Sequence, residues 1–215
     1  MWRRVLINAT LFELVLTVVI GRHWRAFYDI RGVVFNAGLV LWLGMESARV
    51  RLGHRMSVIT VGNFSRMFLI ISVAAVVLAA GERAHRALSF MPRLPVASVY
   101  VGALLFVIGV YLRHLSIKQL GQYFVTKIQI TKDHQLVTDG LYRYIRHPSY
   151  TGLILGFLGA ILFLRAPFSA TLFITIGIPA YMYRIRVEEN ALLDVFGQYY
   201  MDYRAKTRAL LPYLY

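Results

Sequence analysis

The chain has 215 residues, of which 58% are hydrophobic and only 16% are charged, and its mean hydropathy is +0.58. This balance is typical of integral membrane proteins. The sequence contains no cysteine, which excludes disulfides, thiolate zinc sites and cysteine nucleophiles. The formal net charge of +14 resides in short basic clusters beside apolar runs, a pattern of membrane proteins that argues against a nucleic-acid partner.

Four apolar runs occupy the first half of the sequence, and we expect each to form a membrane-spanning helix. They cover residues 5–20, 33–50, 67–81 and 96–112. Each run is somewhat shorter than the ~20 residues that cross ~30 Å of hydrocarbon, but arginines and tyrosines at the ends can reach the interface. The first run resembles a signal peptide without a small-residue cleavage site, so we expect it to remain as a span.

Two acidic residues lie inside these first runs. Glu13 falls within the first run and Glu46 within the second. An isolated carboxylate in hydrocarbon is costly, so Glu13 should face protein, be paired or be protonated. We favour structural pairing for Glu13 over a catalytic role, and the role of Glu46 stays open.

The second half of the chain contains two further apolar runs, residues 152–164 and 168–183. Residues 165–167 join them with the sequence Arg-Ala-Pro, which predicts a tight helical hairpin because proline favours a break and arginine prefers water. Three glycines in the first of these runs would let another helix approach closely, either within the chain or in a dimer. They are Gly152, Gly156 and Gly159.

Together these runs predict an all-α, polytopic transmembrane protein of about six spans. Residues 1–112 would hold four spans, and residues 113–215 would hold a polar stretch, the hairpin and a tail. In the tail, apolar residues recur every three or four positions after residue 184, which predicts an amphipathic helix interrupted at Gly197 and ended by Pro212. Six spans place both termini and the polar stretch on the side richer in lysine and arginine, which should face the cytoplasm.

The polar stretch is residues 133–152, DHQLVTDGLYRYIRHPSYTG. Ionisable clusters near lipid are costly, so a functional site is the default interpretation, with an interfacial loop that binds headgroups as the alternative. Pro148 restricts its own backbone and that of His147, and the helix start that follows suits a carboxylate or other anion. Gly140 allows a positive φ or a close backbone approach. The stretch would therefore suit a zwitterionic cofactor, or it is simply a rigid loop.

A second polar cluster, residues 184–189, ends the last apolar run. Glu188 and Glu189 would point about 100° apart on a helix, so only one of them can face a given site. Arg184 lies one turn before Glu188, which allows either an ordinary ion pair or a cavity in which Arg184 holds an anion and Glu188 a cation. The six histidines lack the spacing of a metal site, and no hydrolase, P-loop or dinucleotide motif is present.

The motif GxYxxxRHPxYxG, followed by a hairpin and EExxLxxxFGxxYxxY, resembles the isoprenylcysteine carboxyl methyltransferase family over roughly residues 110–212. The resemblance implies methyl transfer, inside the membrane, from S-adenosylmethionine to the α-carboxylate of a prenylated cysteine. It also implies two catalytic residues, Glu188 to hold the cofactor's ammonium and Arg184 to orient the acceptor carboxylate. The cofactor contacts it implies are His134, Leu136, Val137, Gly140, Tyr142, His147, Pro148, Ser149, Tyr150 and Glu188.

One family position departs from the pattern. Where some members have a cofactor-contacting glutamine, this chain has Lys127, and Gln129 lies nearby but out of register. The resemblance further implies that a lipophilic acceptor enters from the surrounding membrane lipid while the cofactor enters from the cytoplasm. Alternatives are another acceptor, such as a phospholipid amine or small thiol, an NADPH-dependent membrane reductase, and an inactive scaffold.

Overall fold

The computed structural model describes residues 38, 42, 59–61, 64–84, 92–121, 128–130 and 136–211. The predicted span at 5–20 lies outside these residues, and of the predicted span at 33–50 only residues 38 and 42, both helical, are included. Several positions discussed above also lie outside the described residues: Glu13, Glu46, Lys127, His134 and Pro212.

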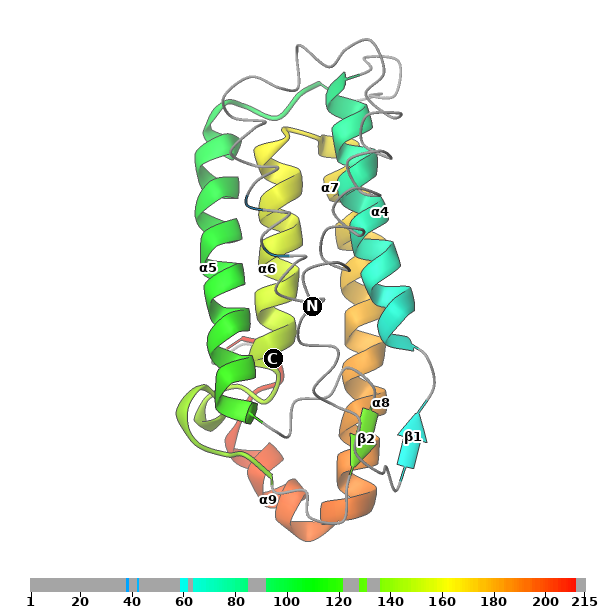
Figure 1. Cartoon of the computed structure of the whole chain (residues 1–215), viewed down its shortest axis with the longest axis vertical. Helices are drawn as coiled ribbons and strands as arrows, with labels where there is room; N and C mark the ends of the chain where they lie inside the picture. Colours follow the sequence, from blue (N-terminus) through cyan, green and yellow to red (C-terminus); the bar gives the residue numbers. More distant parts are fainter. Residues whose placement is uncertain are drawn as a thin grey trace, which may run out of the picture.

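The described part of the chain is mostly helical, as the composition predicts, and its long helices lie nearly parallel to one another (Figure 1). The helices are α4 (Phe64–Ala84), α5 (Ala97–Leu120), α6 (Pro148–Phe163), α7 (Pro167–Leu172), α8 (Ile178–Phe196) and α9 (Gln198–Lys206), with a 3₁₀ helix at Gly140–Arg143 and a π-helix at Phe173–Gly177. Two short strands, β1 (Ile59–Val61) and β2 (Ile128–Ile130), pair antiparallel with Ile59 opposite Ile130. The all-α prediction omitted this pairing, because three-residue strands carry too short an alternation to be recognised.

Glycines bring α5 and α6 into backbone contact. A Cβ on Gly109 would lie 2.4 Å from the backbone nitrogen of Gly156, and a Cβ on Gly102 would lie 2.6 Å from the carbonyl oxygen of Gly159. The two helices therefore run antiparallel at a separation that a side chain would prevent. Of the three glycines noted in the sequence, Gly152 and Gly159 serve this internal contact, while Gly156 also lies against the Trp42 ring.

The outer face of α5 is apolar and exposed. Tyr100 is 70% exposed, Leu104 61% and Val107 64%, and these residues follow one another at three- and four-residue spacing along one side of the helix. A continuous exposed apolar stripe of this length is unusual in a soluble protein. By length and composition, α5 and the helical segment Pro167–Phe196 could each cross a membrane.

Two predicted boundaries differ from the structure. α5 continues to Leu120 beyond the apolar run that ends at residue 112, so the predicted division of the chain falls inside this helix. The polar cluster at 184–189 does not begin a separate tail helix, because α8 continues through it to Phe196. The helix ends at Gly197, whose φ of +52° favours glycine, and α9 follows. The predicted interruption at Gly197 is confirmed.

The Arg165 turn joins α6 to α7 as the sequence predicts. Arg165 has a positive φ of 57°, and its Nε donates a hydrogen bond to the carbonyl oxygen of Leu94 at 2.6 Å. At the same end of the bundle, the buried carboxylate of Glu82 accepts hydrogen bonds from the backbone N–H groups of Phe168 and Ser169 at 3.1 and 2.9 Å. These contacts cap the start of α7.

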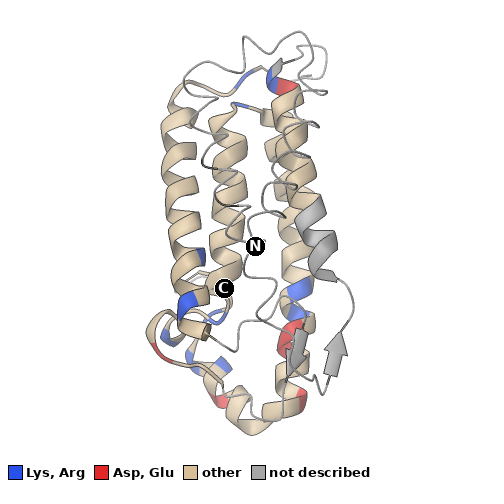
Figure 2. Ribbon diagram, in the orientation of Figure 1, with Lys and Arg blue, Asp and Glu red and all other residues tan. Residues whose placement is uncertain are grey.

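Charged residues in the described helices gather at the two ends of the bundle, with long uncharged stretches between them (Figure 2). An aromatic core fills the space between the helices, and the Trp42 ring lies 4.6 Å from that of Phe157. Phe157 in turn lies 6.3 Å from Phe173. The end of the bundle at which α6 begins carries the polar residues of both sequence clusters.

Candidate functional site

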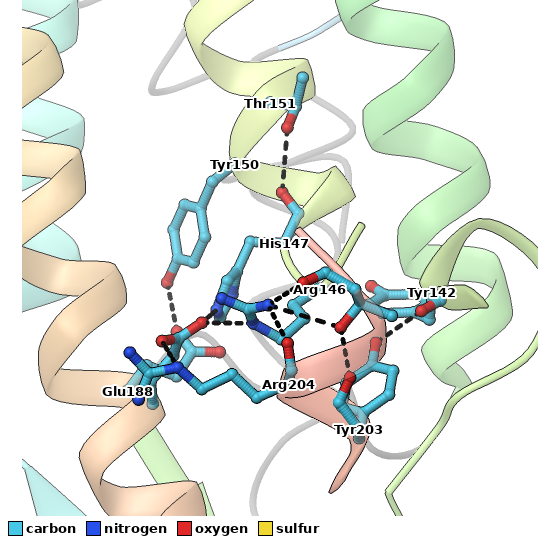
Figure 3. Close-up of polar contacts among 10 residues, drawn as sticks. Tyr142, Arg146, His147, Tyr150, Thr151, Glu188, Tyr203 and Arg204 are labelled. Carbon is cyan, nitrogen blue, oxygen red and sulfur yellow. Dashed lines mark hydrogen bonds and ion pairs between the residues drawn. The ribbon is translucent and has the colours of Figure 1, made fainter. Parts of the chain in front are cut away.

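The two polar clusters meet where α6 starts and the polar half of α8 lies beside it (Figure 3). Residues 144–147 lead into α6, while α9 and residues 207–210 return to the same place. The candidate site is therefore built from segments that are distant in the sequence, since its contacts between α6 and α8 join residues 34 and 38 positions apart.

Tyr150 joins the two residues that the resemblance assigns to opposite charges. Its hydroxyl accepts a hydrogen bond from Arg184 Nε at 2.5 Å and donates one to Glu188 Oε2 at 2.7 Å. The Arg184 guanidinium also lies over the Tyr150 ring, with Cζ 5.7 Å from the ring centroid. The described contacts thus place a tyrosine hydroxyl between Arg184 and Glu188, where the sequence suggested a direct ion pair or a shared cavity.

Glu189 is the acceptor of a second, buried ionic cluster. Its Oε1 accepts a hydrogen bond from Arg146 Nε at 2.6 Å, and both side chains are less than a tenth exposed. His147 Nε2 lies 3.3 Å from the same oxygen, and Arg204 Nε lies 3.6 Å from Oε2. The two glutamates diverge, as expected from their positions on one helix: Glu189 is directed toward Arg146 and Glu188 toward Tyr150.

His147 and Pro148 begin α6 as predicted. The carbonyl oxygen of His147 accepts hydrogen bonds from the backbone N–H groups of Tyr150 and Thr151 at 3.0 and 3.1 Å, and Pro148 occupies the first turn, where its missing N–H costs nothing. The His147 ring is buried against Glu189 and lies 5.7 Å from the Tyr150 ring. It therefore connects the ionic cluster around Glu189 with the hydrogen bonds of Tyr150.

Residues 207–210 form a strap over the segment that precedes α6. The backbone N–H of Arg146 donates to the carbonyl oxygen of Arg208 at 2.7 Å, and that of His147 donates to Ala209 at 3.0 Å. The Thr151 hydroxyl donates to the Leu210 carbonyl oxygen at 2.7 Å. Arg146 also donates, through Nη1, to the Thr207 carbonyl oxygen at 2.5 Å, so one arginine connects the strap to Glu189.

A group of hydroxyls lies between α5, the 3₁₀ helix and α9. The Tyr142 hydroxyl donates to the Ser116 carbonyl oxygen at 3.3 Å, and the Tyr203 hydroxyl donates to the Tyr142 carbonyl oxygen at 2.6 Å. Burial raises the pKa of both hydroxyls above the ordinary tyrosine value, so they remain donors at neutral pH. Arg113, buried on α5, donates to the Ser149 hydroxyl.

Gly140 has the positive φ that the sequence allowed, at 59°. It opens the 3₁₀ helix, and the side chain of Gln119 lies against it, since a Cβ there would be 2.5 Å from Gln119 Nε2. Gln119 Oε1 accepts a hydrogen bond from the backbone N–H of Leu141 at 3.0 Å. A glutamine on α5 therefore fixes the start of this turn.

The structure brings together most of the residues that the resemblance assigns to the site: Tyr142, His147, Pro148, Ser149, Tyr150, Arg184 and Glu188. Leu136 and Val137 are half-buried in the extended segment before Gly140, and His134 lies outside the described residues. Gln129 is in β2.

Four contributors were not predicted: Arg113, Arg146, Glu189 and Thr207. An arginine at the end of an apolar run was the available signal for Arg113. Arg146 and Glu189 lie within the two sequence motifs, but the spacing of the motifs alone does not decide which of the two glutamates faces the site. No sequence signal distinguishes Thr207.

Comparison with known proteins identifies related sequences and a related fold. A model of the isoprenylcysteine carboxyl methyltransferase (ICMT) family matches residues 102–194. The protein-S-isoprenylcysteine O-methyltransferase of Schizosaccharomyces pombe is 39% identical over 107 residues, which cover 49% of this chain and 45% of the relative. That of Saccharomyces cerevisiae is 34% identical over 116 residues, or 53% and 48% of the two chains. The chain thus spans about half the length of these relatives.

A solved structure described as the eukaryotic intramembrane Ras methyltransferase ICMT resembles the fold with a TM-score of 0.50 and 20% sequence identity, covering 97% of this chain and 86% of the other. The segment matched by the family model begins within α5, continues through the hairpin and ends inside α8, so it contains Arg113, the RHP sequence and both glutamates. Residues 102–194 of the chain therefore match the isoprenylcysteine carboxyl methyltransferase family model.

Proposed function

We propose that the protein transfers a methyl group from S-adenosylmethionine to the carboxylate of a prenylcysteine-like lipophilic acceptor within the membrane. The observation that carries the proposal is the pairing of Arg184 and Glu188 through Tyr150, inside a segment of the ICMT family. Arg184 and Glu188 lie one turn apart on the same face of α8. Glu188 can bind the ammonium of an amino-acid ligand, and Arg184 can bind the carboxylate of a second ligand.

The residues present fit S-adenosylmethionine. Glu188 offers a carboxylate for its ammonium. The helix dipole at the start of α6 favours a negative charge such as its carboxylate, while the N–H groups of His147, Tyr150 and Thr151 there donate to carbonyl oxygens of the protein. The Tyr200 hydroxyl is fully buried and has no hydrogen-bond partner among the residues described, although it lies within electrostatic reach of Glu188 and Glu189. A buried donor of this kind needs a partner that a polar ligand can supply.

S-adenosylmethionine would supply a methyl group already activated on a sulfonium sulfur, which an ionised carboxylate can take up without a general base. The protein's task is then to orient the acceptor and exclude water. Arg184, which is 6% exposed, can present its terminal nitrogens to the acceptor carboxylate, since Nε is occupied by Tyr150. The buried aromatic surroundings strengthen that interaction.

The membrane arrangement belongs to the same proposal. We infer six spans, with the site facing the cytoplasm and the acceptor entering from the bilayer between helices. The exposed apolar stripe of α5 and the concentration of charge at the ends of the described helices support this placement. Labelling of single cysteines introduced at Tyr111 and at Tyr199 by a membrane-impermeant reagent, in sealed vesicles, tests it.

Binding of S-adenosylhomocysteine and NADPH, measured by titration calorimetry on detergent-purified protein, tests the function. We expect saturable binding of S-adenosylhomocysteine only. Glu188→Ala should weaken it by at least about thirtyfold, because removing one member of a buried charge pair costs ~2 kcal/mol or more. Arg184→Ala should keep this binding and lose methyl transfer. The exposed residues Asp194 and Arg186 on the same helix provide matched alanine controls.

The acceptor is tested with two compounds, an S-prenylated cysteine with a free α-carboxylate and its carboxamide. Methylation of the first and not the second supports a carboxylate acceptor. NADPH binding without S-adenosylhomocysteine binding would favour a reductase, and methylation of a thiol or amine compound in place of the carboxylate would refute the proposed acceptor.

A further inference from the structure

Tyr150 occupies a position in which its single hydroxyl proton has only one possible direction. A guanidinium can only donate hydrogen bonds and an ionised carboxylate can only accept them. The hydroxyl must therefore accept from Arg184 Nε at 2.5 Å and donate to Glu188 Oε2 at 2.7 Å. Figure 3 shows the Tyr150 ring extending from α6 toward Glu188 on α8.

The two ends of this chain of hydrogen bonds affect one another. The charge on Glu188 polarises the Tyr150 hydroxyl and makes its oxygen a better acceptor for Arg184, because hydrogen bonds in series strengthen one another in a low-dielectric interior. A cation bound at Glu188 reduces that polarisation and weakens the hold on Arg184 Nε. The position of Arg184 therefore depends on what Glu188 binds.

We propose that Tyr150 is a positioning residue that couples the two ligand sites, so that occupancy at Glu188 sets the orientation of Arg184 toward the acceptor. The inference rests on the methyl-transfer function proposed above. It assigns to the Tyr150 side chain a task separate from contact with either ligand. It also gives the enzyme a physical basis for ordering its two substrates, one soluble and one embedded in lipid.

The ring and the hydroxyl of Tyr150 can be separated experimentally. The ring lies 5.7 Å from His147 and 6.1 Å from Tyr181, and Tyr150→Phe keeps these packing contacts while removing both hydrogen bonds. Tyr181 provides a control in the same aromatic surroundings, because its buried hydroxyl lies 2.7 Å from Ser72 Oγ on α4 and is not part of the hydrogen-bond path from Arg184 through Tyr150 to Glu188. Tyr181→Phe thus removes a neighbouring buried hydroxyl without touching the proposed link.

The test measures the affinity for S-adenosylhomocysteine by calorimetry, with and without a saturating S-prenylated cysteine. In the unmodified protein we expect the acceptor to change this affinity by fivefold or more, a typical coupling between two sites. In Tyr150→Phe the ratio should fall to about one, whatever the affinity of that variant for each ligand alone. In Tyr181→Phe it should equal that of the unmodified protein.

The inference would be overturned if the prenylated cysteine left the affinity for S-adenosylhomocysteine unchanged in the unmodified protein. It would also be overturned if the ratio of affinities in Tyr150→Phe equalled that of the unmodified protein, or if Tyr150→Phe and Tyr181→Phe lowered the ratio equally. Failure of the unmodified protein to bind S-adenosylhomocysteine would instead refute the proposed function and remove the basis of the inference.

Kinetics in native membranes give a second readout that needs no purified variant. With Tyr150→Phe, kcat should fall at least tenfold, whereas with Tyr181→Phe it should stay within threefold of the value of the unmodified protein. An equal change in kcat in both variants would contradict the proposal.

Discussion

Replacement of Glu189 by alanine should destabilise the protein strongly, although its neighbour Glu188 is the residue assigned to the cofactor. The Arg146 guanidinium that pairs with Glu189 is 8% exposed and lies 2.6 Å from the carboxylate. Removal of one partner of a buried ion pair leaves an uncompensated charge and costs about 3–5 kcal/mol. Arg146 would keep its hydrogen bonds to the carbonyl oxygens of Thr207 and Arg204, so we expect a loss near the lower end of this range.

The strap supplies a local readout. Arg208 is exposed, and the residues beside it are held to Arg146 and His147 by backbone hydrogen bonds. Loss of Glu189 should release this segment, so trypsin should cleave after Arg208 faster in Glu189→Ala than in the unmodified protein. Thermal unfolding in detergent measures the change in stability of the whole protein.

Glu188→Ala is the matched control, because its carboxylate makes one hydrogen bond among the described residues, with Tyr150, and should lose only about 1 kcal/mol. Replacing both members of the buried pair, with Arg146→Met and Glu189→Met, should recover part of the stability lost in Glu189→Ala, since no charge is then left buried. Equal unfolding temperatures and equal trypsin cleavage for Glu188→Ala and Glu189→Ala would refute the assignment of Glu189 as the structural glutamate.

Two further predictions concern packing and an unpaired hydroxyl. Gly109→Ala should cost ~1–3 kcal/mol, because its Cβ would lie 2.4 Å from the backbone nitrogen of Gly156. An unfolding temperature equal to that of the unmodified protein would contradict the close α5–α6 contact. Tyr200→Phe should stabilise the ligand-free protein by about 1 kcal/mol, because the buried Tyr200 hydroxyl has no hydrogen-bond partner among the residues that the structure describes and such a group is costly. A fall in the unfolding temperature of that variant would show that the hydroxyl is satisfied.

Local sequence signals predicted the elements that depend on a few neighbouring residues. Proline at 167 and arginine at 165 were sufficient to place the hairpin, and proline at 148 placed the start of α6. Glycine at 197 was correctly read as an interruption. In each case the backbone preference of one or two residues decides the conformation, so no knowledge of the tertiary contacts was needed.

Features that depend on the return of the chain were not predictable in this way. The parallel bridge between Ile145 and Arg208 joins residues more than sixty positions apart, and neither position has a distinctive residue type. The continuation of α8 through the polar cluster was missed because charged residues suggest the end of a span. In the structure Arg184, Glu188 and Glu189 face protein partners, so the helix has no reason to stop there.

The division of labour between Glu188 and Glu189 depends on a turn well before them. Pro179 has no N–H to donate within the helix, and the π-helix Phe173–Gly177 immediately precedes it, which accommodates one residue more than a regular turn. One extra residue rotates everything beyond it by about 100°. If the same segment were a regular α-helix, Val187 would take the direction of Glu188 toward Tyr150, and Glu188 would take that of Glu189 toward Arg146. The π-turn therefore sets which glutamate reaches the ligand site and which holds the strap.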